Sequence, residues 1–546
     1  MTESAPPSSI KETLTSIMIA FIVALIFRGF VVEGFQIPTG SMAPTLLGAN
    51  IRSHSELGGY NWASEAWYPE DRGLPPERQQ HVHPTDPMTG VEIAPVRQRI
   101  RSGDRVFVFK YLEPMHSPQR WDVTVFKVPI RTSENYIKRL VGMPGEQLAL
   151  VDGDVFTRPL DASGSGPAGW SQSDWSIVRK PERVQRAVWQ PVFDSQFAPR
   201  QSATFRSPVR GSTSGWTGLD AGPSYTFGGS GPTRLDWLDR VFRLDDYNSY
   251  NELPNFGQRW DRSDQNSFPV SDLSVSFGIE PVDAARSAAV LIETRGHRFR
   301  AMIERVGDGR ATASVAFQSI ADSNDDSPWT TLDSAEVGSA LDSGRVTNVD
   351  FWHVDQALWL WVDGHLVAGG PERGAYEWDI AERLRNNTGE DLAVRLDADT
   401  SGSVRLMAPS FYSPPRLAWE FDAGSFALHR LAVKRDLFYR PTEFQRTSWM
   451  GEPSTTPGRP GLGTHPASPL ILGSDEFFFC GDNSARSLDG RSWGAAHPAM
   501  HEKYPTPPGV VHRNMLIGRA FVVYLPGPER HFGLPIFDFG RMRWIW

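Results

Sequence analysis

One uncharged apolar run near the N-terminus limits how this chain can fold more than any other feature. It spans Leu14–Phe27 and reads LTSIMIAFIVALIF. A helix that crosses a bilayer needs about 20 residues, so the run alone is too short. It reaches that length when the residues from Arg28 to Phe35 are added, because the Arg28 side chain can extend to the lipid headgroups. The pattern predicts a membrane anchor over residues 10–33, preceded by a polar tail over residues 1–9.

A cleavable signal peptide is the alternative interpretation of this run. Such peptides have a basic n-region and an A-x-A-like cleavage site. No such site follows the run, and the residues before it carry only Lys11 against Glu12. We therefore expect a retained anchor. Lys11 and Arg28 flank its two ends, so the positive-inside rule does not assign its orientation.

Composition narrows the class of protein. A chain of 546 residues exceeds a typical single domain, so two or more folded units are expected. The net charge of −9 argues against nucleic acid as the main partner, because phosphate binding requires a cationic surface. The single cysteine, Cys480, cannot form an intramolecular disulfide and is expected on a buried strand.

Short strands recur after the anchor. Apolar runs at 105–109, 121–126, 136–141 and 147–151 predict one group of strands, and the last of them leads into a tight turn at Asp152-Gly153. Residues 50–99, which precede this group, are polar and contain proline-rich turns, a composition that favours a loop insertion.

The character of the sequence changes after residue 158. Serine, glycine, proline and tryptophan are frequent up to about residue 267, and short strands separated by turn signals then recur to Tyr439. Leu392–Leu396 and Val404–Met407 are among the strands expected there. Regular short strands of this kind predict a β-sandwich, at about 270–440.

Two residues far apart in the sequence could form a nucleophile and its base. Ser41 lies a few residues after the anchor, and Lys138 lies on a predicted strand. A serine hydroxyl must lose its proton as it attacks a carbonyl, and lysine accepts a proton only when burial or a cationic neighbour keeps its amine neutral. The backbone N–H of Ser41 and the hydroxyl of Thr39 are candidate donors to the oxyanion.

Four sequence blocks in this order resemble those of the bacterial type I signal peptidases. They are QIPTGSMAPTL at 36–46, WDVTVFK at 121–127, NYIKRLVGMPGE at 135–146 and GDNSARSLDGRSWG at 481–494. The sequence departs from the family at Gly490, where serine is usual, so the packing around this residue need not follow that of the family. The predicted sandwich lies outside the resemblance and loosely resembles the concanavalin or laminin-G-like sandwiches.

The resemblance implies a role for each matched residue. Ser41 would be the nucleophile and Lys138 the general base. Thr39 would contribute to the oxyanion hole, and Ser487 would orient the lysine amine. The other implied site residues are two structural ion pairs, Asp482 with Arg139 and Asp489 with Arg491, and the lining of shallow substrate pockets, Phe35, Ile37 and Ile137.

The resemblance also implies the architecture. We expect a mostly β protein with a signal-peptidase-like β catalytic domain, an N-terminal transmembrane helix and an inserted concanavalin/laminin-G-like β-sandwich. Residues 34–158 and 441–546 would form the catalytic domain, and residues 159–440 the inserted region.

The implied activity is that of a membrane-bound serine endopeptidase. It would remove signal peptides from exported preproteins after small residues at −1 and −3, without a metal or other cofactor. Its partners would be preproteins and the lipid bilayer, with the secretion translocon close by and no nucleic acid. As a single-pass protein of the bacterial cytoplasmic (inner) membrane, it would place its catalytic domain in the periplasm.

Two other classes of protein remain open. One is a catalytically inactive, membrane-tethered binding protein whose sandwich recognises glycans or exported proteins. The other is a self-cleaving repressor with the same catalytic fold. The complete Ser41–Lys138 pair argues against the first, and the apolar anchor and acidic balance argue against the second.

Overall fold

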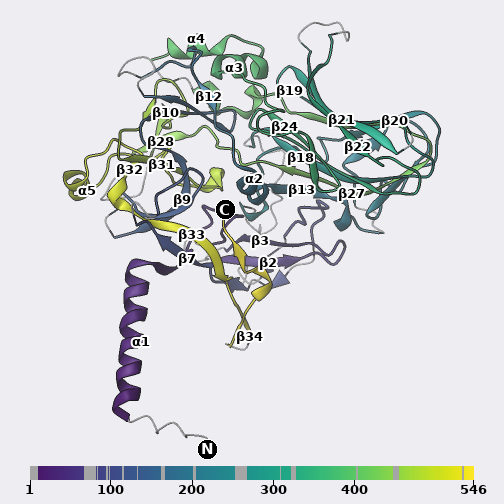
Figure 1. Ribbon diagram of the computed structural model, residues 1–546. Helices are drawn as coiled ribbons and strands as arrows, with labels where there is room; N and C mark the ends of the chain where they lie inside the picture. Colours follow the sequence, from purple (N-terminus) through teal and green to yellow (C-terminus); the bar gives the residue numbers. More distant parts are fainter. Residues whose placement is uncertain are drawn as a thin grey trace, which may run out of the picture.

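The computed structural model shows a β-rich body from which one helix projects (Figure 1). It describes residues 10–546 apart from 67–80, 83, 94–95, 98, 113–115, 132, 161–166, 201–204, 252–266, 308, 321–326, 401, 403, 447–453 and 532–533. The polar tail expected over residues 1–9 lies outside the described residues.

The projecting helix, α1 (Ile10–Phe30), has 21 residues, and none of them is buried. It is long and apolar enough to cross a membrane, because a spanning helix needs about 20 residues. Strand β1 (Val32–Gln36) follows almost at once. The helix therefore ends before residue 33, the expected end of the anchor, because Val32 and Glu33 already pair with another strand of the body.

Segments from both ends of the sequence share one sheet, which we call the main sheet. Its strands lie in the order β1-β7-β33-β8-β9-β31-β32, with β36 beside β33. Their bounds are β7 (Arg105–Lys110), β8 (Val123–Lys127), β9 (Asn135–Gly142), β31 (Glu476–Cys480), β32 (Val510–His512), β33 (Leu516–Leu525) and β36 (Arg543–Trp544). Because strands from before and after the inserted region alternate in this order, the two segments fold together.

A second sheet, which we call the small sheet, also joins strands from before and after the inserted region, since β10 pairs with β30. Its order is β12-β11-β10-β30, with β10 (Glu146–Val151), β11 (Asp154–Pro159), β12 (Ser176–Ile177) and β30 (Leu470–Ile471). Asp152 and Gly153 both have positive φ, 50° and 86°, at the turn between β10 and β11. This turn is the one that the Asp-Gly pair predicts.

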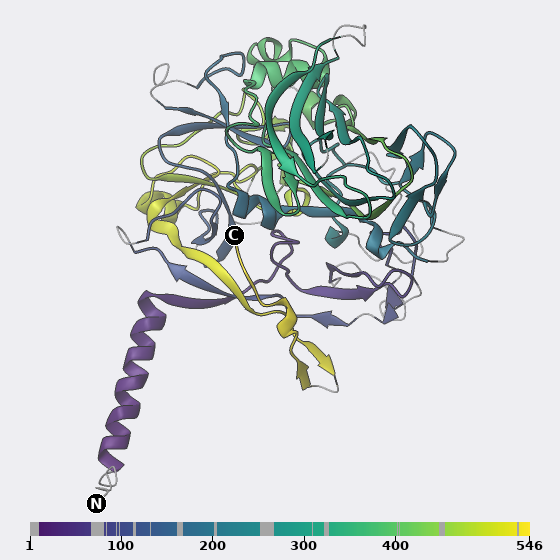
Figure 2. The same cartoon turned by 45° about the vertical axis from the view of Figure 1, so that its right-hand side comes forward.

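The inserted region contains two sheets packed on a common apolar core (Figure 2). The first sheet consists of β13 (Gln190–Asp194), β15 (Trp216–Thr217), β16 (Ser224–Phe227), β18 (Leu273–Pro281), β23 (Thr347–Val354), β24 (Ala357–Val362), β25 (His365–Gly369) and β27 (Phe426–Arg435). The second consists of β14 (Val209–Gly211), β17 (Pro232–Trp237), β19 (Ser287–Thr294), β20 (His297–Gly307), β21 (Arg310–Ser319), β22 (Thr330–Gly338) and β26 (Arg416–Asp422). Alternate residues of both sheets fill the core, as in other sandwiches.

The expected fold class is confirmed in its main parts: the protein is mostly β, with one N-terminal apolar helix and an inserted β-sandwich. The sandwich begins earlier than the predicted residue 270, because β13 to β17 already pair with its later strands. Two expected strands are helices instead, α4 (Leu392–Asp397) and the 3-10 helix η5 (Val404–Met407). In α4 the buried residues Leu392, Ala393 and Leu396 follow helical spacing, which a strand would not place on one face.

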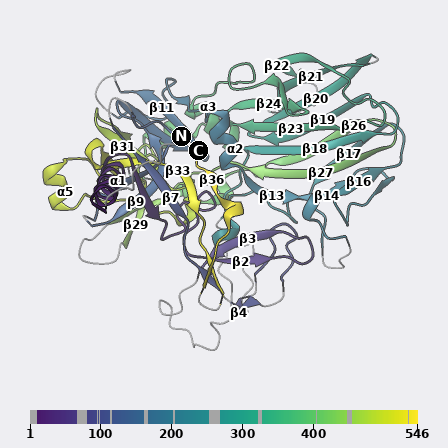
Figure 3. The ribbon, with the colours of Figure 1, turned by 60° about the horizontal axis from the view of Figure 1, so that its bottom comes forward.

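Figure 3 looks nearly along α1 and shows the sandwich to one side of the main sheet. A loop was expected within residues 50–99, but strands are present there. β2 (Asn50–His54) pairs with β3 (Asn61–Glu65) and with β6 (Ile100–Arg101), and β4 (His81–Val82) pairs with β5 (Val96–Arg97). The other elements are α2 (Glu182–Val188), α3 (Ile380–Thr388), α5 (Pro498–Lys503), β28 (Glu443–Arg446), β29 (Ser454–Pro460), β34 (Glu529–His531), β35 (Leu534–Ile536), η3 (Ser195–Phe197), η4 (Ser249–Asn251), η6 (Pro409–Phe411), η7 (Ser484–Arg486), η8 (Arg513–Met515) and η9 (Phe539–Arg541).

Candidate active site

Ser41 and Lys138 meet in the structure although 97 residues separate them: the Lys138 Nζ lies 2.5 Å from the Ser41 Oγ. Ser41 belongs to the serine turn, residues 38–46, which follows β1 directly. Lys138 lies in β9, where it pairs with Thr124 of β8. Pro38 and Pro44 keep the serine turn out of regular helix, so the hydroxyl is presented on a short turn at the edge of the main sheet.

Burial keeps the Lys138 amine poised to lose its proton. The side chain is 3% exposed, and this burial lowers the lysine pKa from 10.5 to about 8. Asp489 opposes the shift and Arg491 adds to it. A buried amine is costly to charge because it loses its hydration, so the neutral form gains population near neutral pH. This is the condition under which lysine can act as a base.

The two predicted helpers of the dyad differ in burial. Thr39 is in the serine turn with its side chain exposed. The Ser487 Oγ is buried against Gly481, and the Ser41 carbonyl also faces that glycine. Among the described residues, Ser487 makes no hydrogen bond to the Lys138 amine. The oxyanion role of Thr39 and the orienting role of Ser487 therefore stay predictions.

The predicted ion pair of Arg139 with Asp482 is present and fully buried. The Arg139 Nε and Nη2 donate to the two carboxylate oxygens of Asp482, at 2.7 and 2.6 Å. The Thr45 hydroxyl donates to the same carboxylate at 2.5 Å. The pair thus ties β9, next to Lys138, to the far end of the serine turn.

The second predicted pair, Asp489 with Arg491, lies behind the lysine. The Arg491 Nε and Nη2 donate to Asp489 at 2.9 and 2.7 Å, and the backbone N–H of Gly481 donates to the same carboxylate at 2.9 Å. The Arg491 guanidinium outweighs the effect of burial and lowers the pKa of Asp489. Asp489 therefore stays charged beside Lys138.

The three residues predicted to line substrate pockets belong to one apolar cluster. Ile37 is 2% exposed and lies within it, while Phe35 and Ile137 are half-buried and pack against it. The structure therefore places Ile37 mainly in the core, and Phe35 and Ile137 nearer the surface.

Sequence reasoning missed Asn483, which supports the serine turn directly. Its backbone N–H donates to the Ser41 carbonyl at 3.1 Å, and its Nδ2 donates to the Gly40 carbonyl at 2.9 Å. The position of Asn483 inside the GDNSARSLDGRSWG block is the signal that could have identified it. Cys480 lies buried in β31, and burial raises the pKa of its thiol well above the usual value, so it is not a nucleophile.

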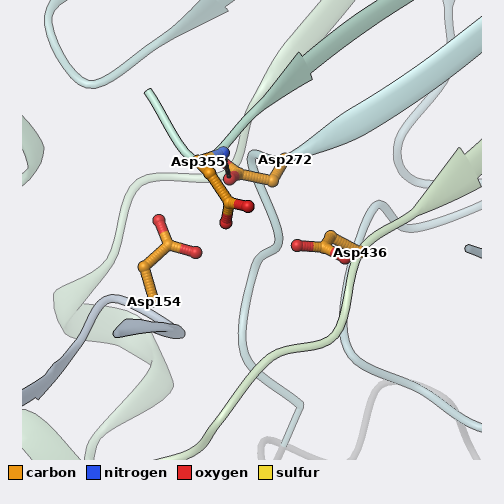
Figure 4. Close-up of side chains that lie close together, drawn as sticks. All are labelled: Asp154, Asp272, Asp355 and Asp436. Carbon is orange, nitrogen blue, oxygen red and sulfur yellow. Dashed lines mark hydrogen bonds between the residues drawn. The ribbon is translucent and has the colours of Figure 1, made fainter. Parts of the chain in front are cut away.

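A second cluster of charged groups lies apart from the dyad, at the junction of the small sheet and the sandwich. Figure 4 shows four carboxylates converging there, and their oxygens lie within 4.8 Å of one another: Asp154, Asp272, Asp355 and Asp436. Asp154 comes from β11, and the other three lie at one end of the sandwich.

Protein cations already occupy the space between these carboxylates. The Lys180 Nζ lies 2.5 Å from Asp355 and 2.8 Å from Asp436, and Arg295 lies 2.7 Å from Asp272. Arg383 is paired with Asp154. Burial, followed by the charge of Asp272, raises the pKa of Asp154 well above its usual value. Each of the four carboxylates thus has a protein cation as its partner, so the cluster is an ionic junction whose donor set does not call for a metal.

Comparison with known proteins supports the resemblance of the sequence blocks. Residues 88–158 match the family described as signal peptidase, peptidase S26. The chain is 24% identical over 155 residues to signal peptidase I of Rickettsia bellii, covering 28% of this chain and 42% of that protein. It is 29% identical over 158 residues to signal peptidase I of Pseudomonas aeruginosa, covering 28% and 40%.

The resemblance to bacterial type I signal peptidases is thus confirmed over the matched part of the chain. The chain spans less than half the length of these relatives. The family match includes Lys138 and ends before the inserted region.

The comparison with solved structures returns β proteins. A carbohydrate-binding module from Bacillus subtilis has a TM-score of 0.22 and 8% identity, covering 42% of this chain and 96% of that one. A non-specific endo-β-1,3(4)-glucanase has a TM-score of 0.25 and 9% identity, covering 50% and 99%.

Proposed function

We propose that the protein is a membrane-bound serine endopeptidase that removes signal peptides from exported preproteins. The observation that carries this proposal is the 2.5 Å contact between Ser41 and the buried Lys138. A hydroxyl paired with an amine of lowered pKa is an activated nucleophile. The similarity to signal peptidase I of two bacteria supports the choice of substrate.

The proposed reaction has two halves. In the first, the Ser41 Oγ attacks the carbonyl carbon of the residue at −1, and its proton passes to the Lys138 Nζ. The tetrahedral intermediate then expels the amine of the mature protein, which takes the proton from Lys138, and an ester remains on Ser41. In the second half, Lys138 removes a proton from water as the water oxygen attacks the ester carbonyl carbon. The bond to the Ser41 Oγ then breaks, Lys138 returns the proton to that oxygen, and the signal peptide leaves as a carboxylic acid.

The main sheet offers a place for an extended substrate next to the dyad. The ladder between β9 and β31 ends at Arg139, so Asn135–Lys138 pair with β8 on one side and with no described strand on the other. A peptide that adds to this edge would bring its carbonyl past the Lys138 amine. Phe35 and Ile137 would then limit the side chains at −1 and −3 to small ones.

The anchor favours a site close to the membrane. α1 leads into β1, and the serine turn follows, so Ser41 lies about ten residues from the end of the helix. We place the body in the periplasm, beside the inner membrane and near the translocon that delivers preproteins. The aromatic residues Phe537, Phe539 and Trp544 are exposed near the C-terminal hairpin β34–β35, which projects on the side of α1 (Figure 1).

A set of matched preproteins tests this proposal. The full-length chain in lipid nanodiscs is incubated with a preprotein that carries Ala at −1 and −3, and with versions that carry Trp at either position. Mass spectrometry reads the new N-terminus. Cleavage after the small residue, lost with Trp and absent from a Ser41→Ala preparation, is expected. Cleavage that is insensitive to the −1 residue, or that persists in Ser41→Ala, would refute the proposed specificity or the proposed nucleophile.

A further inference from the structure

A short segment of the inserted region contacts the serine turn through Asn248 and Tyr250. This bracing segment, residues 248–251, ends in η4. The Asn248 Nδ2 donates to the Ala43 carbonyl at 3.2 Å, and the Tyr250 hydroxyl donates to the Ala49 carbonyl at 3.0 Å. Tyr250 is 2% exposed and packs with Ala43 in one apolar cluster. The inserted region therefore touches the turn that presents the nucleophile.

The last residue of the bracing segment controls the asparagine that holds Ser41. The Asn251 Nδ2 donates to the Asn483 Oδ1 at 2.8 Å, and the Asn483 Nδ2 donates to the Asn251 Oδ1 at 2.7 Å. Asn483 uses its remaining donors for the Gly40 and Ser41 carbonyls. Because the two amides are reciprocally bonded, Asn251 fixes which way the Asn483 amide points.

Tyr250 also explains why glycine precedes the nucleophile. A Cβ added at Gly40 would lie 2.1 Å from the Tyr250 Cε1, far inside van der Waals contact. The ring therefore sets the path of the backbone into Ser41. A displacement of about 1 Å at a nucleophile can cost two orders of magnitude in rate, so a contact of this kind acts on catalysis.

The two residues just before the bracing segment are bonded to arginines at the end of β27 and after it. The Arg435 Nη2 donates to the backbone carbonyls of Asp246 and Tyr247, at 3.1 and 2.9 Å, and Arg440 pairs with the Asp246 carboxylate. Arg435 is the last residue of β27, so the sandwich carries the segment. The ionic junction at Asp154 fixes the sandwich to the small sheet independently.

We propose that the inserted region is part of the active-site scaffold, and that Asn251 and Tyr250 are positioning residues for Ser41. The proposal rests on the proposed peptidase function. On this view the sandwich is not an independent binding module attached to a self-sufficient enzyme. It supplies one wall of the support that holds the nucleophile within reach of Lys138.

Three variants of the full-length chain test the proposal. Asn251→Ala removes both amide bonds, and Asn251→Asp keeps the shape but places a second oxygen against the Asn483 Oδ1. Asn348→Ala is the control, because Asn348 is an exposed sandwich asparagine far from the serine turn in sequence, bonded to Asp363. We expect kcat to fall about tenfold in Asn251→Ala and further in Asn251→Asp, with KM within about twofold and the control unchanged.

The relative activities of Asn251→Ala and Asn251→Asp distinguish a positioning role of Asn251 from a packing role. If Asn251 only fills space, Asn251→Asp retains activity, and this result would overturn the proposal. Hydrogen exchange of the peptide over residues 38–47 gives a readout that does not need catalysis: exchange should accelerate in both Asn251 variants and not in Asn348→Ala. Unchanged exchange in Asn251→Ala would also overturn it. A wild type that fails to cleave preproteins would instead refute the proposed function, while exchange still decides the role of Asn251.

Discussion

The pH dependence of cleavage follows directly from the burial of Lys138. With a pKa of about 8, about 1% of this lysine is neutral at pH 6, about 9% at pH 7 and about 91% at pH 9. An unperturbed lysine would be only about 0.03% neutral at pH 7, so burial raises the reactive fraction about 300-fold. Because the neutral amine is the base, kcat should rise about 90-fold between pH 6 and pH 9 and then level off.

The assay is the steady-state cleavage of a fluorogenic peptide with Ala at −1 and −3, at saturating concentration in detergent micelles. Lys127→Ala is a matched control, since Lys127 is an exposed lysine of the neighbouring strand β8. It should show the same midpoint as the wild type. A profile that keeps rising tenfold per pH unit beyond pH 9.5, or one that is flat between pH 6 and pH 9, would refute the role of Lys138 as a base with a lowered pKa.

Three further predictions concern buried charges, and chemical denaturation measures each of them. Lys138→Met should raise the free energy of unfolding by about 3 kcal/mol at pH 7, because the native state no longer holds a lysine whose charged form burial disfavours. The folded pKa of Lys138 lies below its unfolded value of 10.5, so the extra stability of Lys138→Met over the wild type should shrink as the pH rises from about 8 to 10.5. A stability difference that stays constant over this range would contradict the prediction. Asp482→Ala should destabilise the protein by about 3–5 kcal/mol, because it leaves Arg139 charged and unpaired in the interior. Lys180→Met should be similarly costly, because Asp355 loses its counter-charge; unfolding midpoints equal to the wild type would contradict the last two readings.

The contact between Ser41 and Lys138 was easier to predict from the sequence than the contacts that support the serine turn. The short blocks around Ser41 and Lys138 are local patterns, and their joint occurrence indicates a paired serine and lysine, although a strand lysine taken alone is usually a solvated edge charge. The bonds that hold the serine turn depend on contacts across the whole chain. Asn251 and Asn483 are 232 residues apart, and nothing in the composition around residue 251 marks it.

The N-terminal boundary of the sandwich could not be predicted from local sequence patterns either. Strands β13 and β16 are short, and their partner β27 lies over two hundred residues later, so only the tertiary pairing reveals them. Likewise the segment Leu392–Leu396 has enough apolar residues for either a strand or a helix. The segment is a helix because its apolar residues then lie on one face, which packs against the small sheet.

The measurement that tests the central claim most directly is the cleavage of one preprotein by four variants of the intact chain at pH 9. Ser41→Ala and Lys138→Ala remove the dyad, while Ser474→Ala and Lys127→Ala remove an exposed serine and an exposed lysine outside it. The account predicts that the first two variants lose cleavage by at least about a thousandfold while remaining folded, and that the two controls match the wild type. Cleavage by Lys138→Ala at a rate near that of the wild type would contradict it.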